Sequence, residues 1–455
     1  MLRSTLICLV AAALSVAQEK PPEGSAPKPY KLPPVETFRL KNGMQVTLVP
    51  YGSVPKVAIE ARIRAGNYLE GPKQVWLADL TGEALKEGTS SKTATQVAEA
   101  AALMGGQIDI GVSEEFTSAT ADVLSEFGPD AVALLADVLQ NPRLPASELP
   151  RLKEGLSRRL AIAKSQPGAL AEERFRSALY PDQPYGRIFP TQEMIAAYTP
   201  EDVRGFYAKN MGAQRTHLYV AGRFDAAAMR KAITAAFSNW AKGTEPEILT
   251  AKTTARPVRD LLDRPGAPQS TIRLGLGVAG PNESDKIAQD VADAILGGSF
   301  ASRITTNIRE QKGYTYSPRS TVSSRYHEAH WVEAADVTTA VTGPALHEIF
   351  AEIERLRKEP PGAEELKGIQ HYLAGVFVLR NSSREGIIGQ LAFVDFQGLP
   401  KDYLSTYVQN VIAVKPGDVQ RIAEKYFTPS KMSLVVVGDK AKIADQVKPY
   451  LAKPE

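Results

Sequence analysis

The sequence has a single cysteine, Cys8, which lies in an N-terminal segment that we expect to be removed from the mature protein. A mature chain without a thiol has no disulfide bond, no cysteine nucleophile and no thiolate metal site. Histidine is also scarce, because there are 5 in 455 residues and the first of them is His217. Residues 1–216 therefore offer no imidazole that could bind a metal ion.

Other absences exclude further classes of protein. Lys and Arg number 54 against 51 Asp and Glu, so the basic excess typical of nucleic-acid binding is missing. No apolar run reaches the roughly 18 residues of a spanning helix, and we expect no membrane span. The segment Gly275-Leu-Gly-Val-Ala-Gly280 matches a dinucleotide fingerprint, but Pro281 follows where a helix should begin, which argues against a bound dinucleotide.

The N-terminus has the pattern of a secretory signal. Arg3 gives a short basic start, residues 6–14 are apolar, and Ser15-Val16-Ala17 forms a small-x-small cleavage site. We therefore expect residues 1–17 to be a signal peptide and the protein to be exported. A bacterial periplasm suits this signal, and full secretion fits it equally. Residues 18–34 are rich in proline and are expected to form a disordered leader.

The chain repeats itself at a spacing of 216 residues. Thr199-Pro-Glu-Asp-Val-Arg corresponds to Lys415-Pro-Gly-Asp-Val-Gln, and the alignment continues without a gap to Gly222 and Gly438. In both copies a helix that starts with proline is followed by a short apolar strand that ends in glycine. The repeat predicts two similar domains.

These patterns predict an α+β fold with two similar domains, each a mostly antiparallel sheet with helices packed on one face. The first domain is expected to cover residues 35–242 and the second residues 269–455. Residues 243–268 are rich in proline, threonine and charge and lack periodicity, so we expect them to form a linker.

Only two histidines, His327 and His330, lie close together in the sequence. The surrounding residues alternate as in a strand, where a spacing of three places two side chains on opposite faces. We expect both to be exposed polar positions that do not share a metal ion, and the isolated histidines to be structural.

Several segments together carry a family resemblance. They are Lys86-Glu-Gly-Thr89, residues 98–106, Tyr180-Pro-Asp-Gln-Pro-Tyr-Gly186, Leu296-Gly-Gly-Ser-Phe-Ala-Ser-Arg303, Ile308-Arg-Glu-Gln-Lys-Gly-Tyr-Thr-Tyr-Ser317 and both repeat units. On these segments the chain resembles the insulinase/pitrilysin-like metallopeptidases, which include the mitochondrial processing peptidase, over about residues 35–450. The resemblance implies that the two domains form a clamshell.

Catalytic members of this family carry H-x-x-E-H on the first helix, where two histidines bind zinc and the glutamate activates water. Counting from the end of the matching helix, these positions are Asp79, Gly82 and Glu83 here. The later helix that should add an acidic ligand carries Arg158 and Arg159, whose charge repels zinc. We therefore expect no bound metal and no catalytic residue of its own in this chain. A salt-bridged helix face is favoured over a hard cation held by Asp79 and Glu83.

The second half retains Arg309 and Tyr316. In the resembled family such a pair reaches across the clamshell to the zinc site, where it holds substrate carbonyls and stabilises the oxyanion. A structural role, with Arg309 complementing a helix dipole and Tyr316 packing, is the alternative. Tyr314 departs from the aliphatic residue that the family usually carries there.

The resemblance implies a non-catalytic, substrate-binding subunit of a heterodimeric, exported zinc metallopeptidase. Its partner would be a homologous subunit that carries H-x-x-E-H and the zinc ion, and its substrate an unfolded peptide bound along a sheet edge. An alternative is a catalytically inactive scaffold or peptide-binding protein of the same fold, as in the core proteins of the respiratory cytochrome bc complex. A stand-alone peptidase with another metal site is disfavoured by the scarcity of histidine.

Overall fold

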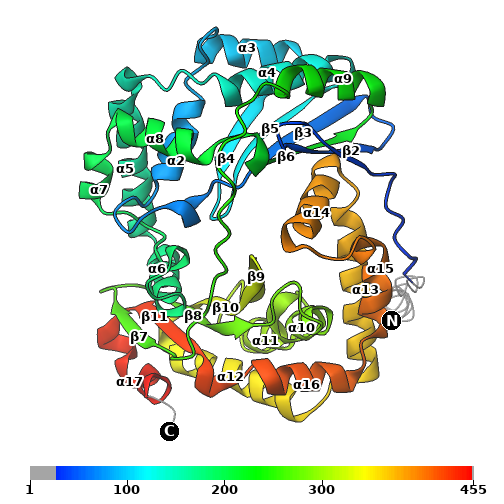
Figure 1. Cartoon of the computed structure of the whole chain (residues 1–455). Coiled ribbons are helices and arrows are strands. Elements are labelled where there is room, and N and C mark those ends of the chain that lie inside the picture. Colours follow the sequence, from blue (N-terminus) through cyan, green and yellow to red (C-terminus); the bar gives the residue numbers. More distant parts are fainter. Residues whose placement is uncertain (1–26, 453–455) are drawn as a thin grey trace, which may run out of the picture.

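The computed structural model describes residues 27–452, and two β-sheets organise them (Figure 1). The predicted signal peptide and residues 18–26 of the leader lie outside the described residues. Helices α3 (Ala94–Leu103), α4 (Gly128–Gln140) and α9 (Ala226–Phe237) lie above the first sheet (Figure 1). Helices α12 (Thr342–Lys358), α16 (Pro416–Tyr426) and α17 (Lys440–Leu451) lie below the second. The two sheets therefore face each other, and the predicted α+β fold with two similar domains in a clamshell is confirmed.

The first sheet has the strand order β1-β2-β6-β3-β5-β4. Its neighbours pair antiparallel except β2 and β6, which are parallel. Its strands are β1 (Glu36–Arg39), β2 (Gln45–Pro50), β3 (Lys56–Ile63), β4 (Ile108–Val112), β5 (Thr117–Leu124) and β6 (Thr216–Gly222). The longer helices of this half are α2 (Leu77–Leu85), α3 (Ala94–Leu103), α4 (Gly128–Gln140), α5 (Leu149–Ser165), α8 (Pro200–Asn210) and α9 (Ala226–Phe237).

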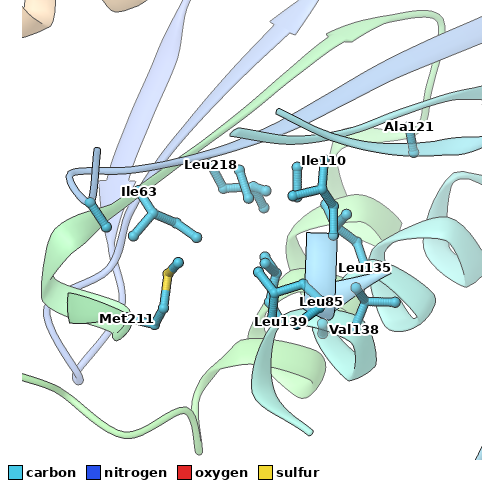
Figure 2. Close-up of a cluster of buried hydrophobic side chains, with 14 of the residues drawn as sticks. Ile63, Leu85, Ile110, Ala121, Leu135, Val138, Leu139, Met211 and Leu218 are labelled. Carbon is cyan, nitrogen blue, oxygen red and sulfur yellow. The ribbon is translucent and has the colours of Figure 1, made fainter. Parts of the chain in front are cut away.

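Alternation along the strands explains which face of this sheet is buried. β5 alternates buried and half-buried residues along its length, as a strand with one apolar face does. Figure 2 shows the buried face, where Ile63, Ile110 and Leu218 of the strands meet Leu85 of α2 and Leu135 of α4. Burial of these apolar side chains holds α2 at a fixed place on the sheet.

The second sheet has the order β7-β11-β8-β10-β9. Its strands are β7 (Arg259–Asp263), β8 (Gln269–Val278), β9 (Arg319–Arg325), β10 (Glu328–Thr338) and β11 (Ser433–Gly438). Its helices are α10 (Lys286–Asp293), α11 (Arg303–Thr305), α12 (Thr342–Lys358), α13 (Ala363–Arg380), α14 (Arg384–Gln397), α15 (Tyr403–Ala413), α16 (Pro416–Tyr426) and α17 (Lys440–Leu451). Two π-helical segments, η6 (Ala294–Gly298) and η7 (Thr306–Gln311), flank α11.

The predicted repeat is confirmed in three dimensions. Helices α8 and α16 begin and end at residues 216 apart, and each leads into an inner strand of its sheet, β6 or β11. β6 is parallel to β2 and antiparallel to β3, as β11 is parallel to β7 and antiparallel to β8. The two halves therefore share topology as well as sequence pattern.

The halves also exchange helices. α6 (Pro167–Leu179) of the first half packs on the inner face of the second sheet, where Phe175 contacts a cluster that includes Val435. In return α14 places Ile388 in a cluster with Tyr219 and Ala221 on the inner face of the first sheet. Each sheet thus carries a helix from the other half on its inner face, in addition to the helices on its outer face.

Two local expectations differ from the structure. Residues 259–263, within the predicted linker 243–268, form strand β7, which pairs in parallel with β11. Residues 27–34 of the predicted disordered leader pack against the protein, where the rings of Tyr30 and Phe377 meet edge to face at 5.3 Å. A strand of five residues and a proline-rich segment are both fixed by distant contacts, which local sequence does not show. Within the described residues, no helix combines the length and apolar content needed to cross a bilayer.

Candidate functional site

The start of α2 is held by a buried carboxylate. Glu70 accepts hydrogen bonds from the backbone N–H groups of Trp76 at 3.0 Å and Ala78 at 2.8 Å. These bonds satisfy donors that a helix N-terminus leaves unpaired. Glu70 is 6% exposed, and burial raises its pKa to about 8, while its hydrogen bonds to Trp76, Ala78 and Asn67 oppose that rise.

Asp79 on α2 forms an ion pair with Arg159 on α5. An Arg159 N–H group donates to Asp79 Oδ1 at 2.6 Å, and the side-chain amide of Asn67 donates to Oδ2 at 2.7 Å. The Arg159 guanidinium also lies over the Trp76 ring, 4.2 Å from its centroid. At the place where the family resemblance predicts an acidic metal ligand, α5 therefore supplies a cation.

Gly82 and Glu83 complete the three positions predicted from the zinc motif. A Cβ atom at Gly82 would lie 2.7 Å from Val112 Cγ2 on β4, so a side chain there requires the Val112 side chain or its surroundings to shift. Glu83 pairs with Lys86 at 3.0 Å on the exposed side of the helix. Asp79 and Glu83 are thus both engaged in ion pairs, as expected for a salt-bridged helix face and not for two ligands of a hard cation.

These residues do not fit a zinc ion. Zinc in proteins takes imidazole, thiolate or carboxylate ligands in a tetrahedron, and this face of α2 offers only the carboxylates of Asp79 and Glu83, which are both already paired. Within residues 27–452, no group of three or more His, Cys, Asp or Glu side chains is arranged to hold a metal. We derive no metal-dependent step from this half of the chain.

The structure brings Arg309 and Tyr316 together. Arg309 lies on η7, and Gly313, with a φ of 62°, ends the segment as glycine at a helix end does. The Arg309 guanidinium carbon is 4.7 Å from the centroid of the Tyr316 ring and 4.6 Å from that of Phe300. Two aromatic rings therefore flank one guanidinium.

Phe300 is a site residue that the sequence did not single out. It is 64% exposed and Tyr316 is 79% exposed, which is unusual for aromatic rings of this size. Phe300 lies in the turn between η6 and α11, because η6 ends at Gly298 and α11 begins at Arg303. The only local sign of its role in the sequence is its position after Gly297 and Gly298 and before helix α11.

Arg309 lines a pocket of about 560 Å³ that also contains Arg273 of β8 and Arg319 of β9. A second pocket, of about 760 Å³, is lined by both halves of the chain. Gly298, Arg319 and Tyr372 line both pockets, so the two are adjacent. We call them the arginine pocket and the inter-half pocket.

Aromatic side chains and a sheet edge shape the inter-half pocket. β9 is the last strand of the second sheet and pairs with β10 alone in the part of the chain that the structure describes. The aromatic residues that line this pocket are Phe116, Tyr372, Phe377, Phe393, Phe396, Tyr403 and Tyr407. Unpaired strand groups beside apolar side chains are the features that bind extended peptides.

His330 corrects the expectation of an exposed position. It is 2% exposed, and its Nδ1 lies 2.7 Å from the Tyr180 hydroxyl of the first half. Burial holds the pKa of His330 well below its usual range, so the ring is neutral. His327 lies in the turn before β10, with a φ of 56°. The sequence missed the burial of His330 because the residue that covers it, Tyr180, lies 150 positions away.

The chain matches two family models. Residues 47–190 match the model described as insulinase (peptidase family M16), and residues 197–373 match the peptidase M16 inactive domain. A protein of Rickettsia felis named an uncharacterized zinc protease is 28% identical over 281 residues, which cover 61% of this chain and 68% of that protein. An uncharacterized zinc protease of Bacillus subtilis is 25% identical over 380 residues, which cover 79% of this chain and 90% of the relative.

Solved structures share the fold. The peptidase M16 inactive domain from Pseudomonas fluorescens has a TM-score of 0.81 at 23% identity, covering 89% of this chain and 98% of that one. A protease from Helicobacter pylori has a TM-score of 0.84 at 19% identity, covering 90% and 100%. A chain from complex III2 of Candida albicans has a TM-score of 0.76 at 16% identity, covering 92% and 99%.

Proposed function

The chain belongs to peptidase family M16, and on that premise we propose that it is the non-catalytic, substrate-binding subunit of a heterodimeric zinc metallopeptidase. In this proposal the partner is a homologous subunit that carries H-x-x-E-H and binds zinc. This chain binds an unfolded peptide and supplies Arg309 and Tyr316 to the partner's active site. The signal-like N-terminus supports export, with the periplasm as the simplest compartment.

One contrast carries the proposal. The positions of the zinc motif are filled by ion-paired carboxylates and a glycine packed on β4, whereas Arg309 lines an open pocket and lies over the ring of the exposed Tyr316. An arginine needed only for stability would be expected to hold a neighbouring helix or strand. Instead, Arg309 pairs with the adjacent and half-exposed Glu310, at 2.9 Å.

The two donors suit peptide carbonyl oxygens. A guanidinium offers planar N–H groups and a phenol offers one O–H group, and both favour an oxygen on which negative charge develops. Stacking of the Tyr316 and Phe300 rings on Arg309 limits the rotation of its guanidinium, so less conformational entropy is lost when it binds. The adjacent edge of β9 gives an extended peptide a strand to pair with.

The alternative is a catalytically inactive scaffold or peptide-binding protein of the same fold. The likeness to a chain from complex III2 of Candida albicans supports this alternative, because that chain has the same fold and is part of a larger complex. In that case the partner would gain no catalytic group from Arg309.

The test uses a quenched, unstructured peptide with added zinc and three samples. They are this protein alone, the H-x-x-E-H homologue alone and an equimolar mixture. We expect cleavage only in the mixture, abolished by a chelator. Chelator-sensitive cleavage by this protein alone would overturn the argument against its own metal site. Equal rates for the homologue alone and for the mixture would favour the scaffold.

A further inference from the structure

Positive charge converges on the arginine pocket from three elements. Arg273 comes from β8, Arg309 from η7 and Arg319 from β9, and all three line the same space of about 560 Å³. Asp336 is the one carboxylate among the lining residues, and it accepts a hydrogen bond from the Thr271 hydroxyl. The lining thus holds three guanidinium groups and one carboxylate. The buried Glu333 lies behind Gly297, and burial raises the pKa of its carboxyl well above its usual range although Arg273 and Arg319 oppose that rise.

The three guanidinium groups keep donors available. Arg273 approaches Glu172 of α6 only at 3.6 Å, and Arg309 pairs with Glu310, which is 52% exposed. Ion pairs with exposed partners contribute little and exchange readily for another anion. Arg319 makes no ion pair and no side-chain hydrogen bond with any residue in the described range 27–452. An oxyanion entering the pocket therefore meets N–H groups from more than one arginine.

A buried hydroxyl adds a donor to the same pocket. Ser299 is 6% exposed and lines the pocket, and its Oγ has no hydrogen-bond partner among the residues that the structure describes. A buried hydroxyl without a partner costs free energy that a ligand oxygen would recover. Ser299 also precedes Phe300 in the chain, and both residues line this pocket.

We infer that the arginine pocket binds the carboxylate of an acidic side chain, and that this pocket selects peptides with Asp or Glu at that position. The inference rests on the proposed function, because it assumes a peptide along β9. Guanidinium groups bind carboxylates through paired, charge-assisted hydrogen bonds, which are stronger than bonds between neutral groups. Arg319 and Tyr372 line both pockets, so residues next to the acidic one enter the aromatic inter-half pocket.

The experiment measures fluorescence polarisation of labelled, unstructured peptides with the full chain. One peptide has a central Glu between aromatic residues, and its match has Gln; both are amidated at the C-terminus. A third has Gln in the centre and a free C-terminal carboxylate. Arg319→Gln removes an exposed guanidinium without breaking a described contact, and Lys401→Gln removes an exposed charge outside both pockets.

We expect the Glu peptide to bind at least about tenfold more tightly than the Gln peptide, as for a hydrogen bond to a charged group. Arg319→Gln should reduce the ratio of the Kd of the Gln peptide to that of the Glu peptide to about threefold or less, whereas Lys401→Gln should leave this ratio unchanged. The ratio should also fall when salt is raised.

Other results would overturn the inference in distinguishable ways. Equal binding of the Glu and Gln peptides would reject the acidic side chain and leave peptide binding intact. Tighter binding of the free C-terminus than of the internal Glu would assign the pocket to chain ends instead. If the preference for the Glu peptide persists in Arg319→Gln, or falls equally in Lys401→Gln, the arginine pocket is not the site that selects the acidic side chain. Absence of binding for every peptide would reject the proposed function together with the inference.

Discussion

Replacing Arg159 with alanine tests whether the guanidinium of this residue stabilises the protein at the position where catalytic members of the family would be expected to bind a metal ion. The substitution removes the 2.6 Å ion pair with Asp79 and the stacking on Trp76. Asp79 is 16% exposed at its side chain and Arg159 is 45% exposed, so the pair is only partly shielded from water. A surface ion pair contributes about 0.2–1 kcal/mol and a cation–π contact about 0.5–1 kcal/mol, which together give about 1–2 kcal/mol.

The assay is thermal unfolding followed by circular dichroism, with and without EDTA. A loss of about 1–2 kcal/mol corresponds to a fall in Tm of roughly 2–8 °C for an unfolding unit of about 150–250 residues. Arg158→Ala is the matched control, because Arg158 pairs on the same helix only with Glu154, and their side chains are 63% and 70% exposed. Its effect should stay within about 0.5 kcal/mol.

Two outcomes would refute this reasoning. The first is a wild-type Tm that falls on addition of EDTA, because that would show a structural metal. The second is equal Tm values for Arg159→Ala and Arg158→Ala, because the ion pair and the stacking would then contribute nothing measurable. A double-mutant cycle with Asp79→Asn isolates the coupling between the two side chains.

Two further predictions concern packing and pH. Gly82→Ala should destabilise the protein by about 1–3 kcal/mol in urea unfolding, because its Cβ would lie 2.7 Å from Val112 Cγ2; Gly155→Ala, at an open position on α5, should stabilise it slightly. Burial lowers the pKa of His217 to about 3, so folding favours its neutral form. The stability from His217 is complete above pH 6.5 and is lost by about 1.4 kcal/mol per pH unit below it. His217→Gln should therefore flatten the loss of Tm between pH 6.5 and 5, and an unchanged slope would contradict this assignment.

Much of the fold could be predicted from the sequence because its strongest signals are local and repeated. The proline-capped helices and the strands after them recur at one spacing, and α8 and α16 confirm it. β7 was missed because its five residues form a strand only beside β11, about 170 residues later. The exchange of α6 and α14 between the halves was missed for the same reason, because the apolar face of a helix does not show which of the two sheets it packs against.

The candidate site was partly predictable in the same sense. The sequence marked Asp79 and Arg159 as positions of a lost metal site, but their mutual ion pair depends on how α2 and α5 pack. Arg309 and Tyr316 are seven residues apart, and the turn at Gly313 brings them together as expected. Phe300 and Arg273 come from other elements, and only the folded chain shows that they share a pocket with Arg309.

The most direct test of the central claim is the steady-state kinetics of the reconstituted pair with Tyr316→Phe and Arg309→Lys. Tyr316→Phe keeps the ring that stacks on Arg309 and removes one donor, while Arg309→Lys keeps the charge and removes the planar fork. If both groups act on the reacting carbonyl, kcat should fall by about 10²-fold or more with little change in KM and in the zinc content of the partner. Unchanged kcat in both variants, with the complex still formed, would show that this chain does not contribute to the partner's active site.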